Sequence, residues 1–401
     1  MPSPGASTSA PRPAIYVDGV EQPGLTADLE ELVIEEALSQ PARCRGRFAN
    51  VAPTRAGVEF TYFGLQAVTF GRSLTVWQGV PPATLVRMFE GRVDDVGGAY
   101  PEAAPPGFVV GAGDGLAAFR ERQRTRTFED VSDSEMIQTI AGEHGLALDL
   151  DLAGPQPTHA VTVQLNQSDA AFLADRLAAL DAAMWIEAGT LVVRASASAP
   201  VQTLQYGREL TAFDVSASLQ GQRSAIGVTG WDVRAKQAFV ATAVDADLTA
   251  ASGTTATGPR IRELAFGPAI EAAVDELPAT AEEAHGLAVA HLRARAARFI
   301  TGRGQAIGAV ALRAGHAVDV QGLGTLFSGT YQVTAVRHEF TRDRGWRTTF
   351  DIRRQALGPV GKSRPSEENV HARAGSRHDT AHRDRRRGAS ARRRTPARRP
   401  T

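Results

Sequence analysis

Cysteine is nearly absent from this chain of 401 residues, because Cys44 is the only one. A single cysteine excludes an intramolecular disulfide, a thiolate zinc site and a Cys-x-x-Cys redox pair, and it is usually a small buried hydrophobic residue. Lysine is almost missing too, since Lys236 and Lys362 are the only two among 44 basic residues. The other basic residues are arginines, which indicates a GC-rich coding bias.

Long hydrophobic runs are also missing. No window approaches the ~20 consecutive apolar residues that a membrane-spanning helix needs. The first 14 residues, MPSPGASTSAPRPA, show no basic segment followed by an apolar run, so no secretory signal is visible. We therefore expect a soluble product of a reducing cytoplasm.

Motifs for catalysis and cofactor binding fail on spacing. Three glycine pairs, at 111/113, 302/304 and 322/324, lack the third glycine of the dinucleotide fingerprint, and we interpret them as turn glycines. No Gly-Lys-Ser/Thr phosphate loop occurs, and His338-Glu339 has no second histidine at zincin spacing. Ser328-Gly329 lacks the Gly-x of a nucleophile elbow. We expect no enzyme, with no catalytic residues, cofactor or metal.

The formal net charge of zero hides an asymmetry. Residues 361–401 hold 13 Lys and Arg against 4 Asp and Glu, so the tail is basic and the rest of the chain is acidic. Clustered arginines neutralise phosphates, which favours binding of nucleic acid or another anionic surface. The alternative is a solvated, GC-biased extension without a partner. The candidate anion-binding residues are Arg385, Arg386, Arg387, Arg392, Arg393 and Arg394.

The first third of the chain has the pattern of a β-rich domain. Residues 1–13 are rich in Pro, Ser and Ala and are predicted to be disordered. Asp18-Gly19 is a tight hairpin signal. Short β-type runs separated by turn residues then continue to Phe119, which is typical of a barrel or sandwich.

Residues 113–146 mark the change to a mixed α+β module at 125–202. Arginines alternate with other residues here, so an extended strand would place all four on one face, either as a solvated edge or as contacts to another domain or subunit. These candidate contact residues are Arg120, Arg122, Arg124 and Arg126. Ser132 and Glu135 have capping-box spacing, Ser168 is a predicted N-cap, and Ala188-Gly189 predicts a hairpin.

Strand patterns return at 203–240. Thr280 and Glu283 form a second capping box, which predicts a helix at 281–301 that ends at Gly302. Residues 307–352 are again β-rich, and 361–401 are predicted to be a disordered Arg-rich tail.

An ordered series of segments resembles the phage late control gene D family, the hub proteins of contractile tails. The series covers roughly residues 14–355, and its pieces are Met88 to Val93, Gly113 to Leu116, Arg124 to Phe128, Asn166 to Asp169, Val228 to Asp232, Gly322 to Gly324 and Ser328 to Tyr331. The resemblance is also to the hub part of VgrG-type spike proteins. It supplies facing subunits and domains with which the arginine row could pair.

The resemblance implies a homotrimeric baseplate hub, assembled in the bacterial cytoplasm, of a phage tail or injection system. It implies an α+β, β-rich fold with two tube-protein-like β-barrels, one at 14–124 completed by 203–240 and one at 203–355, and the α+β module between them. The implied partners are the hexameric tail tube, a separate spike protein and baseplate wedge proteins. Two alternatives stay open: a protein that binds nucleic acid through the tail alone, and a cell-wall hydrolase, for which the acidic body is the only support.

Overall fold

The computed structural model describes residues 12–54, 57–79, 85–102, 104–152, 157–195, 199–232, 235–248, 256–273 and 278–358. Residues 1–11 and the Arg-rich tail lie outside these ranges, so the disorder predicted for both ends and the six tail arginines lie outside the described residues. The fold below is that of the described residues up to Gly358.

Seven N-terminal strands belong to a large, mostly antiparallel sheet. They are β1 (Ala14–Val17), β2 (Val20–Glu21), β3 (Leu29–Ala37), β4 (Arg43–Ala49), β7 (Ser73–Gln78), β8 (Val86–Ala99) and β9 (Gly107–Gly113). β7 and the first six residues of β4 bury every second side chain, as expected for strands with one face on a core. Asp18 and Gly19 both have positive φ in the turn between β1 and β2, which confirms the predicted hairpin.

Six further strands of the same sheet come from the second half of the chain. They are β15 (Pro200–Gln205), β16 (Leu210–Ala217), β21 (Ile300–Ile307), β22 (Ala317–Gln321), β23 (Gly329–Thr341) and β24 (Gly345–Arg354). We expected residues 203–240 to complete the N-terminal strand group. Instead, β15 pairs with β22 at residues 317–321, and β16 pairs with β21 at residues 300–306. Both partners belong to the C-terminal strand group.

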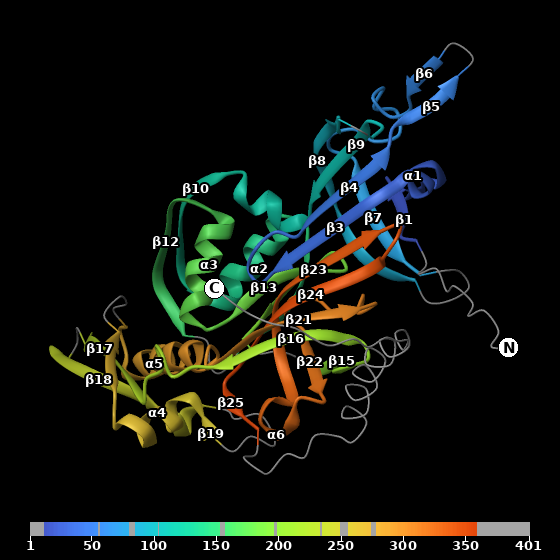
Figure 1. Ribbon diagram of the computed structural model, residues 1–401. Helices are drawn as coiled ribbons and strands as arrows, with labels where there is room; N and C mark the ends of the chain where they lie inside the picture. The colour runs from blue at the N-terminus through green and yellow to red at the C-terminus, as the bar shows by residue number, and fades with distance from the viewer. Residues whose placement is uncertain are drawn as a thin grey trace, which may run out of the picture. The chain divides into compact units, whose positions relative to one another are not determined.

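The long strand β23 joins the two groups. Its first part, Gly329–Gln332, pairs with β22, and its second part, Ala335–Thr341, pairs with β3. β24 runs along its other edge. In Figure 1 the orange β23 and β24 accordingly lie beside the blue β3. The strand order runs from β16 to β2, and no closed barrel occurs among the described strands.

Two of the three glycine pairs lie in strands, which corrects their interpretation as turn glycines. Gly111 and Gly113 belong to β9, and Gly302 and Gly304 belong to β21. A Cβ on Gly304 would collide with the Phe350 ring on the neighbouring strand β24. Close approach between strands therefore explains this glycine, as it often does inside strands.

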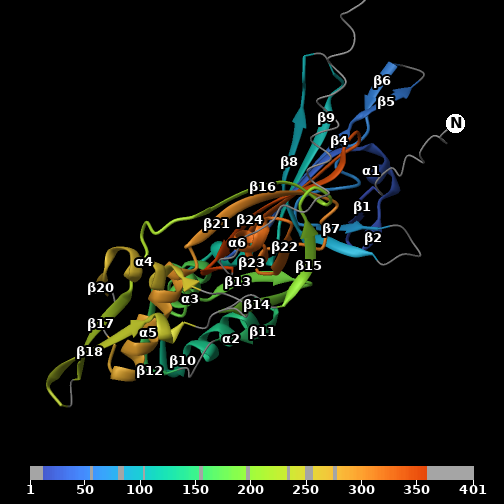
Figure 2. The ribbon, with the colours of Figure 1, turned by 60° about the horizontal axis from the view of Figure 1, so that its bottom comes forward.

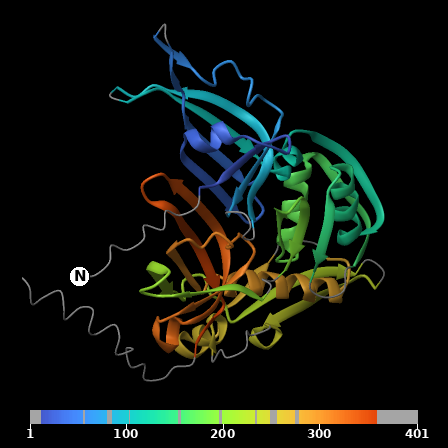
Figure 3. The same ribbon diagram turned by 90° about the vertical axis from the view of Figure 1, so that its right-hand side faces the viewer.

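Residues 115–194 form the α+β module. Its elements are the 3-10 helix η1 (Gly115–Arg120), β10 (Gln123–Ser132), α2 (Asp133–Glu143), β11 (Ala147–Asp151), β12 (Thr158–Ser168), α3 (Asp169–Ala179), β13 (Ala183–Glu187) and β14 (Thr190–Arg194). β10 and β12 form a two-stranded ribbon, and β11, β14 and β13 form a small sheet. Figure 3 shows the ribbon, in teal and green, curving around the outside of the two helices. The capping box at Ser132 and Glu135 and the N-cap Ser168 are confirmed.

A third sheet, which we call the arm sheet, has the order β18-β17-β20. It consists of β17 (Ala225–Asp232), β18 (Gln237–Val244) and β20 (Ile270–Ala273), and α5 (Ala281–Ala296) packs on one face. Figure 2 shows α5 along one side of the β17–β18 hairpin. Thr280 caps α5 as predicted, but the predicted capping box is incomplete, because the Glu283 side chain accepts from the Ala279 N–H. The predicted end at Gly302 is wrong, because residues from Ile300 onward pair as β21 between β16 and β24.

The remaining elements are short. They are α1 (Pro23–Asp28), β5 (Val51–Thr54), β6 (Gly57–Phe60), the 3-10 helix η2 (Asp245–Asp247), β19 (Ala256–Thr257), α4 (Gly258–Phe266), α6 (Gly324–Phe327) and β25 (Ala356–Leu357). Among the described helices, none is both long and apolar enough to cross a membrane. Cys44 is buried in the core of the N-terminal strands, and burial raises the pKa of its thiol to about 12.

Candidate functional site: an interlobe junction and two apolar surfaces

Three parts of the fold meet around Arg313. This residue lies in the segment 308–316, which connects β21 to β22. Its Nη1 donates to Glu36 Oε1 on β3 and to the Met88 carbonyl on β8, each at 2.6 Å. Its Nη2 donates to the Arg87 carbonyl. The guanidinium therefore fastens the C-terminal strand group to two N-terminal strands.

The hairpin β13–β14 of the α+β module reaches the same junction. His316 Nε2 lies 3.2 Å from both carboxylate oxygens of Glu187, at the end of β13. Ser39, in the turn after β3, donates its backbone N–H to the Met184 carbonyl at 2.8 Å. These contacts hold the module against both strand groups.

A cleft of about 370 Å³ lies at this junction, lined among others by Glu36, Asp114, Trp185, Arg313 and His316. Burial raises the pKa of Glu36, and the neighbouring Arg313 charge opposes the rise. Burial also raises the pKa of Asp114 to about 7. Arg313 pairs with Glu36 and His316 pairs with Glu187, so these contacts link the parts of the fold that line the cleft.

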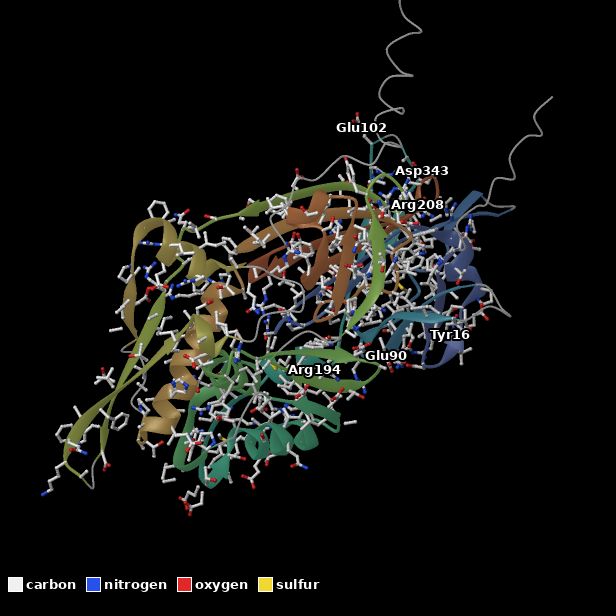
Figure 4. All side chains as sticks on the ribbon, turned by 90° about the horizontal axis from the view of Figure 1, so that it is seen from below. Tyr16, Glu90, Glu102, Arg194, Arg208 and Asp343 are labelled. Carbon is white, nitrogen blue, oxygen red and sulfur yellow. The ribbon has the colours of Figure 1, made fainter. Side chains whose placement is uncertain are left out.

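The small sheet of the α+β module, whose strand β13 reaches the cleft, carries a further ion pair. Arg194 extends from β14 (Figure 4), and its Nη2 donates to Asp149 Oδ2 on β11 at 2.7 Å. The two residues come from parallel neighbouring strands and lie two register positions apart, because Arg194 is opposite Asp151 and Asp149 is opposite Val192. Among the described residues, no group of three or more His, Cys, Asp or Glu side chains could hold a metal ion.

Two arginines of the predicted row form an ion-pair cluster inside the α+β module. Arg124 Nη1 lies 2.8 Å from Glu143 Oε2 and its Nε lies 3.2 Å from Asp169 Oδ2. Arg126 contacts the same two acids, at 2.7 Å and 3.1 Å. The cluster thus ties β10 to the end of α2 and the start of α3.

Asp169 is the centre of this cluster. Burial alone would raise its pKa, but hydrogen bonds with Gln164 and His144 and the charges of Arg124 and Arg126 hold the pKa below its ordinary value. Its side chain is 2% exposed, so it accepts these bonds with almost no water around it. A charge-assisted network of this kind is stronger than separate neutral hydrogen bonds.

The other two arginines of the row do not lie in the strand, which corrects the expectation of four side chains on one strand face. Arg120 ends η1 and donates to Gln40 in the turn before β4, so it contacts the N-terminal strand group. Arg122 lies between η1 and β10 and is exposed. A register shift also separates Arg124 from Arg126. Contact of the row with another subunit stays a prediction.

Sequence reasoning missed Arg313 and Glu36. The sequence around Arg313, ALRAGHAV, shows neither helical nor alternating spacing that would single out the arginine. Its partner lies 277 residues away, so no local pattern connects the two. Arg87 and Met88 contribute only backbone carbonyls, which any residue type would supply.

Among the described residues of β17, β18 and β20, none on the outer face of the arm sheet is charged. Register pairs place on it Ala225, Gly227, Thr229 and Trp231 of β17, Ala238, Val240, Thr242 and Val244 of β18, and Ile270 and Ala272 of β20. Trp231, Val240 and Ile270 are 54%, 67% and 72% exposed. A solvated sheet face is normally polar, so this composition indicates a docking surface.

A second apolar surface lies on the ribbon. Val161, Val163 and Leu165 alternate along β12 and are 62%, 50% and 67% exposed. The other face of the ribbon packs inward, where the Phe128 ring stacks on Phe172 of α3. We call these three side chains the β12 row.

Solved structures with a similar fold are tail proteins. The 43 kDa tail protein of prophage MuSo2 from Shewanella oneidensis has a TM-score of 0.61 at 14% identity, over 85% of this chain and 97% of that chain. A tail protein from Neisseria meningitidis has a TM-score of 0.59 at 13% identity, over 86% and 97%.

A component of the type VI secretion system of E. coli, described as similar to T4 bacteriophage tail proteins gp27 and gp5, has a TM-score of 0.54 at 12% identity, over 86% of this chain and 79% of that chain. At these identities the likeness shows a shared fold.

Comparison by sequence gives one family. No curated protein matches the chain. A family model described as the Alg8 N-terminal domain matches residues 101–342, which is more than half of the sequence and includes the α+β module and the arm sheet. The chain therefore belongs to the family described as Alg8 N-terminal domain.

Proposed function

We propose that this chain is the structural baseplate hub of a contractile phage tail or a phage-tail-like injection system. The observation that carries the proposal is the fold shared with tail proteins over 85% of this chain and 97% of the Shewanella oneidensis tail protein. The ordered segments that resemble the late control gene D family support the same role. We assign the chain no catalytic step.

In this role the hub is a homotrimer that joins a hexameric tail tube to a trimeric spike. Each subunit contributes its N-terminal and C-terminal strand groups as two tube-protein-like units, so three subunits present six similar units to the tube. β23 supports this arrangement, since one continuous strand fixes both groups in each subunit. Arg313 reinforces it through its bonds to β3 and β8.

The test is the mass and binding of the full chain. Sedimentation equilibrium should give three copies, and the trimer should retain purified tube protein and spike protein from the same gene cluster. A full chain that stays monomeric at high concentration, alone and with both partners, would contradict the proposal. Retention of one partner without the other would limit the role to that side of the tail.

A further inference from the structure

The arm sheet presents a surface that its own chain leaves open. α5 covers the inner face through contacts with Ile226, Val228 and Ala243, so the outer face points away from the body. Beside α4, this face includes a cleft of 440 Å³ lined by Ala225, Val244 and Ile270 together with the ion-paired Arg260 and Glu263. Among the small outward residues, Ala238 and Ala272 are exposed and leave room for larger side chains from outside, whereas Ala225 and Gly227 are buried.

The β12 row has the same residue spacing as the outward residues of β17. Alternate residues of a strand lie about 6.6 Å apart, both along Val161, Val163 and Leu165 and along the outward residues of β17. Two sheet faces pack by placing such rows between each other about 10 Å apart. The centre of an interface is typically depleted of charge. The residues of the β12 row and the outward residues of the arm sheet are uncharged, although Glu129 lies opposite Val161 and the Arg260–Glu263 pair lines the cleft beside the arm sheet.

The two surfaces cannot meet within one subunit. The start of β12 faces the start of α5, where His159 Nδ1 lies 3.9 Å from Glu283 Oε1. α5 covers the inner face of the arm sheet, so it lies between the ribbon and the outer face. A contact between these two surfaces therefore needs two copies of the chain.

Rotational symmetry of higher order than two requires two different surfaces on each subunit, because every interface joins unlike patches. A twofold contact would instead use one self-complementary surface. We infer that the β12 row of one subunit docks on the outer face of the arm sheet of a second copy, in an interface repeated around the threefold axis. This inference rests on the proposed trimeric hub and names its subunit contact.

Charge substitutions test both surfaces. Val240→Glu and Val163→Glu each put a charge into the contact while leaving the subunit folded, because both side chains are at least half exposed. Val20→Glu is the matched control, at a position on β2 that is 62% exposed and outside both surfaces. We expect each test variant to raise the dissociation constant of the trimer about tenfold or more, and the control to leave it unchanged. Circular dichroism checks that all three remain folded.

Cross-linking distinguishes which surfaces meet. Cys44 is buried and the pKa of its thiol is raised, so it does not react under mild oxidation. Any disulfide therefore comes from the added surface cysteines. Mixing Val163→Cys with Val240→Cys chains should give a disulfide dimer under mild oxidation, and neither variant alone should give one. A dimer of Val240→Cys alone indicates twofold packing and overturns the inference.

The remaining outcomes separate the inference from the proposed function. A trimer that both glutamate variants leave intact overturns the inference and leaves the hub standing. A trimer that stays intact while Val240→Glu loses tube or spike binding also overturns it, because the arm sheet then serves another partner. An unmodified chain that is monomeric with and without partners contradicts the hub itself.

Discussion

Arg313 and Glu36 form an ion pair across 277 residues of sequence, with Nη1 2.6 Å from Oε1. The two side chains are only 13% and 16% exposed, so water screens neither charge well. The pair links the segment before β22 to β3. It therefore holds the two strand groups together at a second place besides β23.

Replacing Arg313 should destabilise the chain strongly. Arg313→Met leaves the Glu36 carboxylate buried without its partner, which typically costs about 3–5 kcal/mol. The carbonyls of Arg87 and Met88 lose a donor as well. Guanidinium unfolding at pH 7 measures the change, and Arg303→Met, in the exposed pair with Asp351, is the control that should leave stability nearly unchanged. Equal losses in both variants would contradict a special role for the junction.

The arginine row should act mainly inside its module. Arg126→Ser removes bonds to Glu143, Asp169 and Gln164, so we expect a loss of about 1–3 kcal/mol in unfolding free energy. Arg122→Ser changes an exposed residue and should leave unfolding unaffected. If Arg126→Ser instead weakened subunit association in a salt-dependent way at unchanged stability, the row would serve the subunit interface.

His338 should make stability fall in acid. It is fully buried, its Nε2 donates to the Leu312 carbonyl at 2.9 Å, and its Nδ1 lies 3.0 Å from Thr348 Oγ1. Burial lowers its pKa from 6.5 to about 3. As pH falls, the unfolded chain takes up the proton before the folded chain does. The contribution of His338 to the free energy of unfolding is therefore complete above pH 6.5, and between pH 6.5 and pH 3 it falls by about 1.4 kcal/mol per pH unit.

Comparison with His338→Gln isolates this slope, because the variant has no titrating group at position 338. Asp114 has the opposite pH dependence. Its pKa is raised from 3.8 to about 7, so its contribution is complete below pH 3.8 and is lost as pH rises through 7, and it cancels in the comparison because both proteins contain it. Urea unfolding of both proteins should be measured from pH 4 to pH 7. As the pH falls, the free energy of unfolding of the unmodified chain should decrease relative to that of His338→Gln. A constant difference would show that His338 is not the group that titrates.

The Arg-rich tail should control any binding to nucleic acid. Retention of the full chain on DNA should fall steeply with salt, because arginines release counterions from phosphates. Deleting residues 361–401, or replacing Arg385–Arg387 and Arg392–Arg394 by serine, should remove this retention. Unchanged retention after both changes would place DNA binding elsewhere in the chain.

Local features could be predicted from the sequence. The capping box at Ser132 and Glu135 and the N-cap at Ser168 depend on a few neighbouring residues, and the structure has them. The Ala188-Gly189 turn likewise combines two positive φ angles within one hairpin. Each of these signals lies within the segment that it shapes.

Long-range pairing could not be predicted from local patterns. The end of α5 at Ala296 depends on the pairing of Ile300 with strands on both sides, and no stop signal in the sequence marks it. Arg337 of β23 lies beside Glu35 of β3, 302 residues away. Arg313 and Glu36 are likewise brought together only by the pairing of distant strands. Local sequence patterns, which predict helix caps, therefore do not predict the candidate site.

The pairing of β3 with β23 joins two segments that are made far apart in time during synthesis. Until residues 335–341 leave the ribosome, the nascent chain holds β3 with one edge open, although its other neighbour β4 has already been made. An open strand edge invites pairing with other chains. A chain that is terminated before Ala335 keeps that edge of β3 open, so such fragments are prone to aggregate.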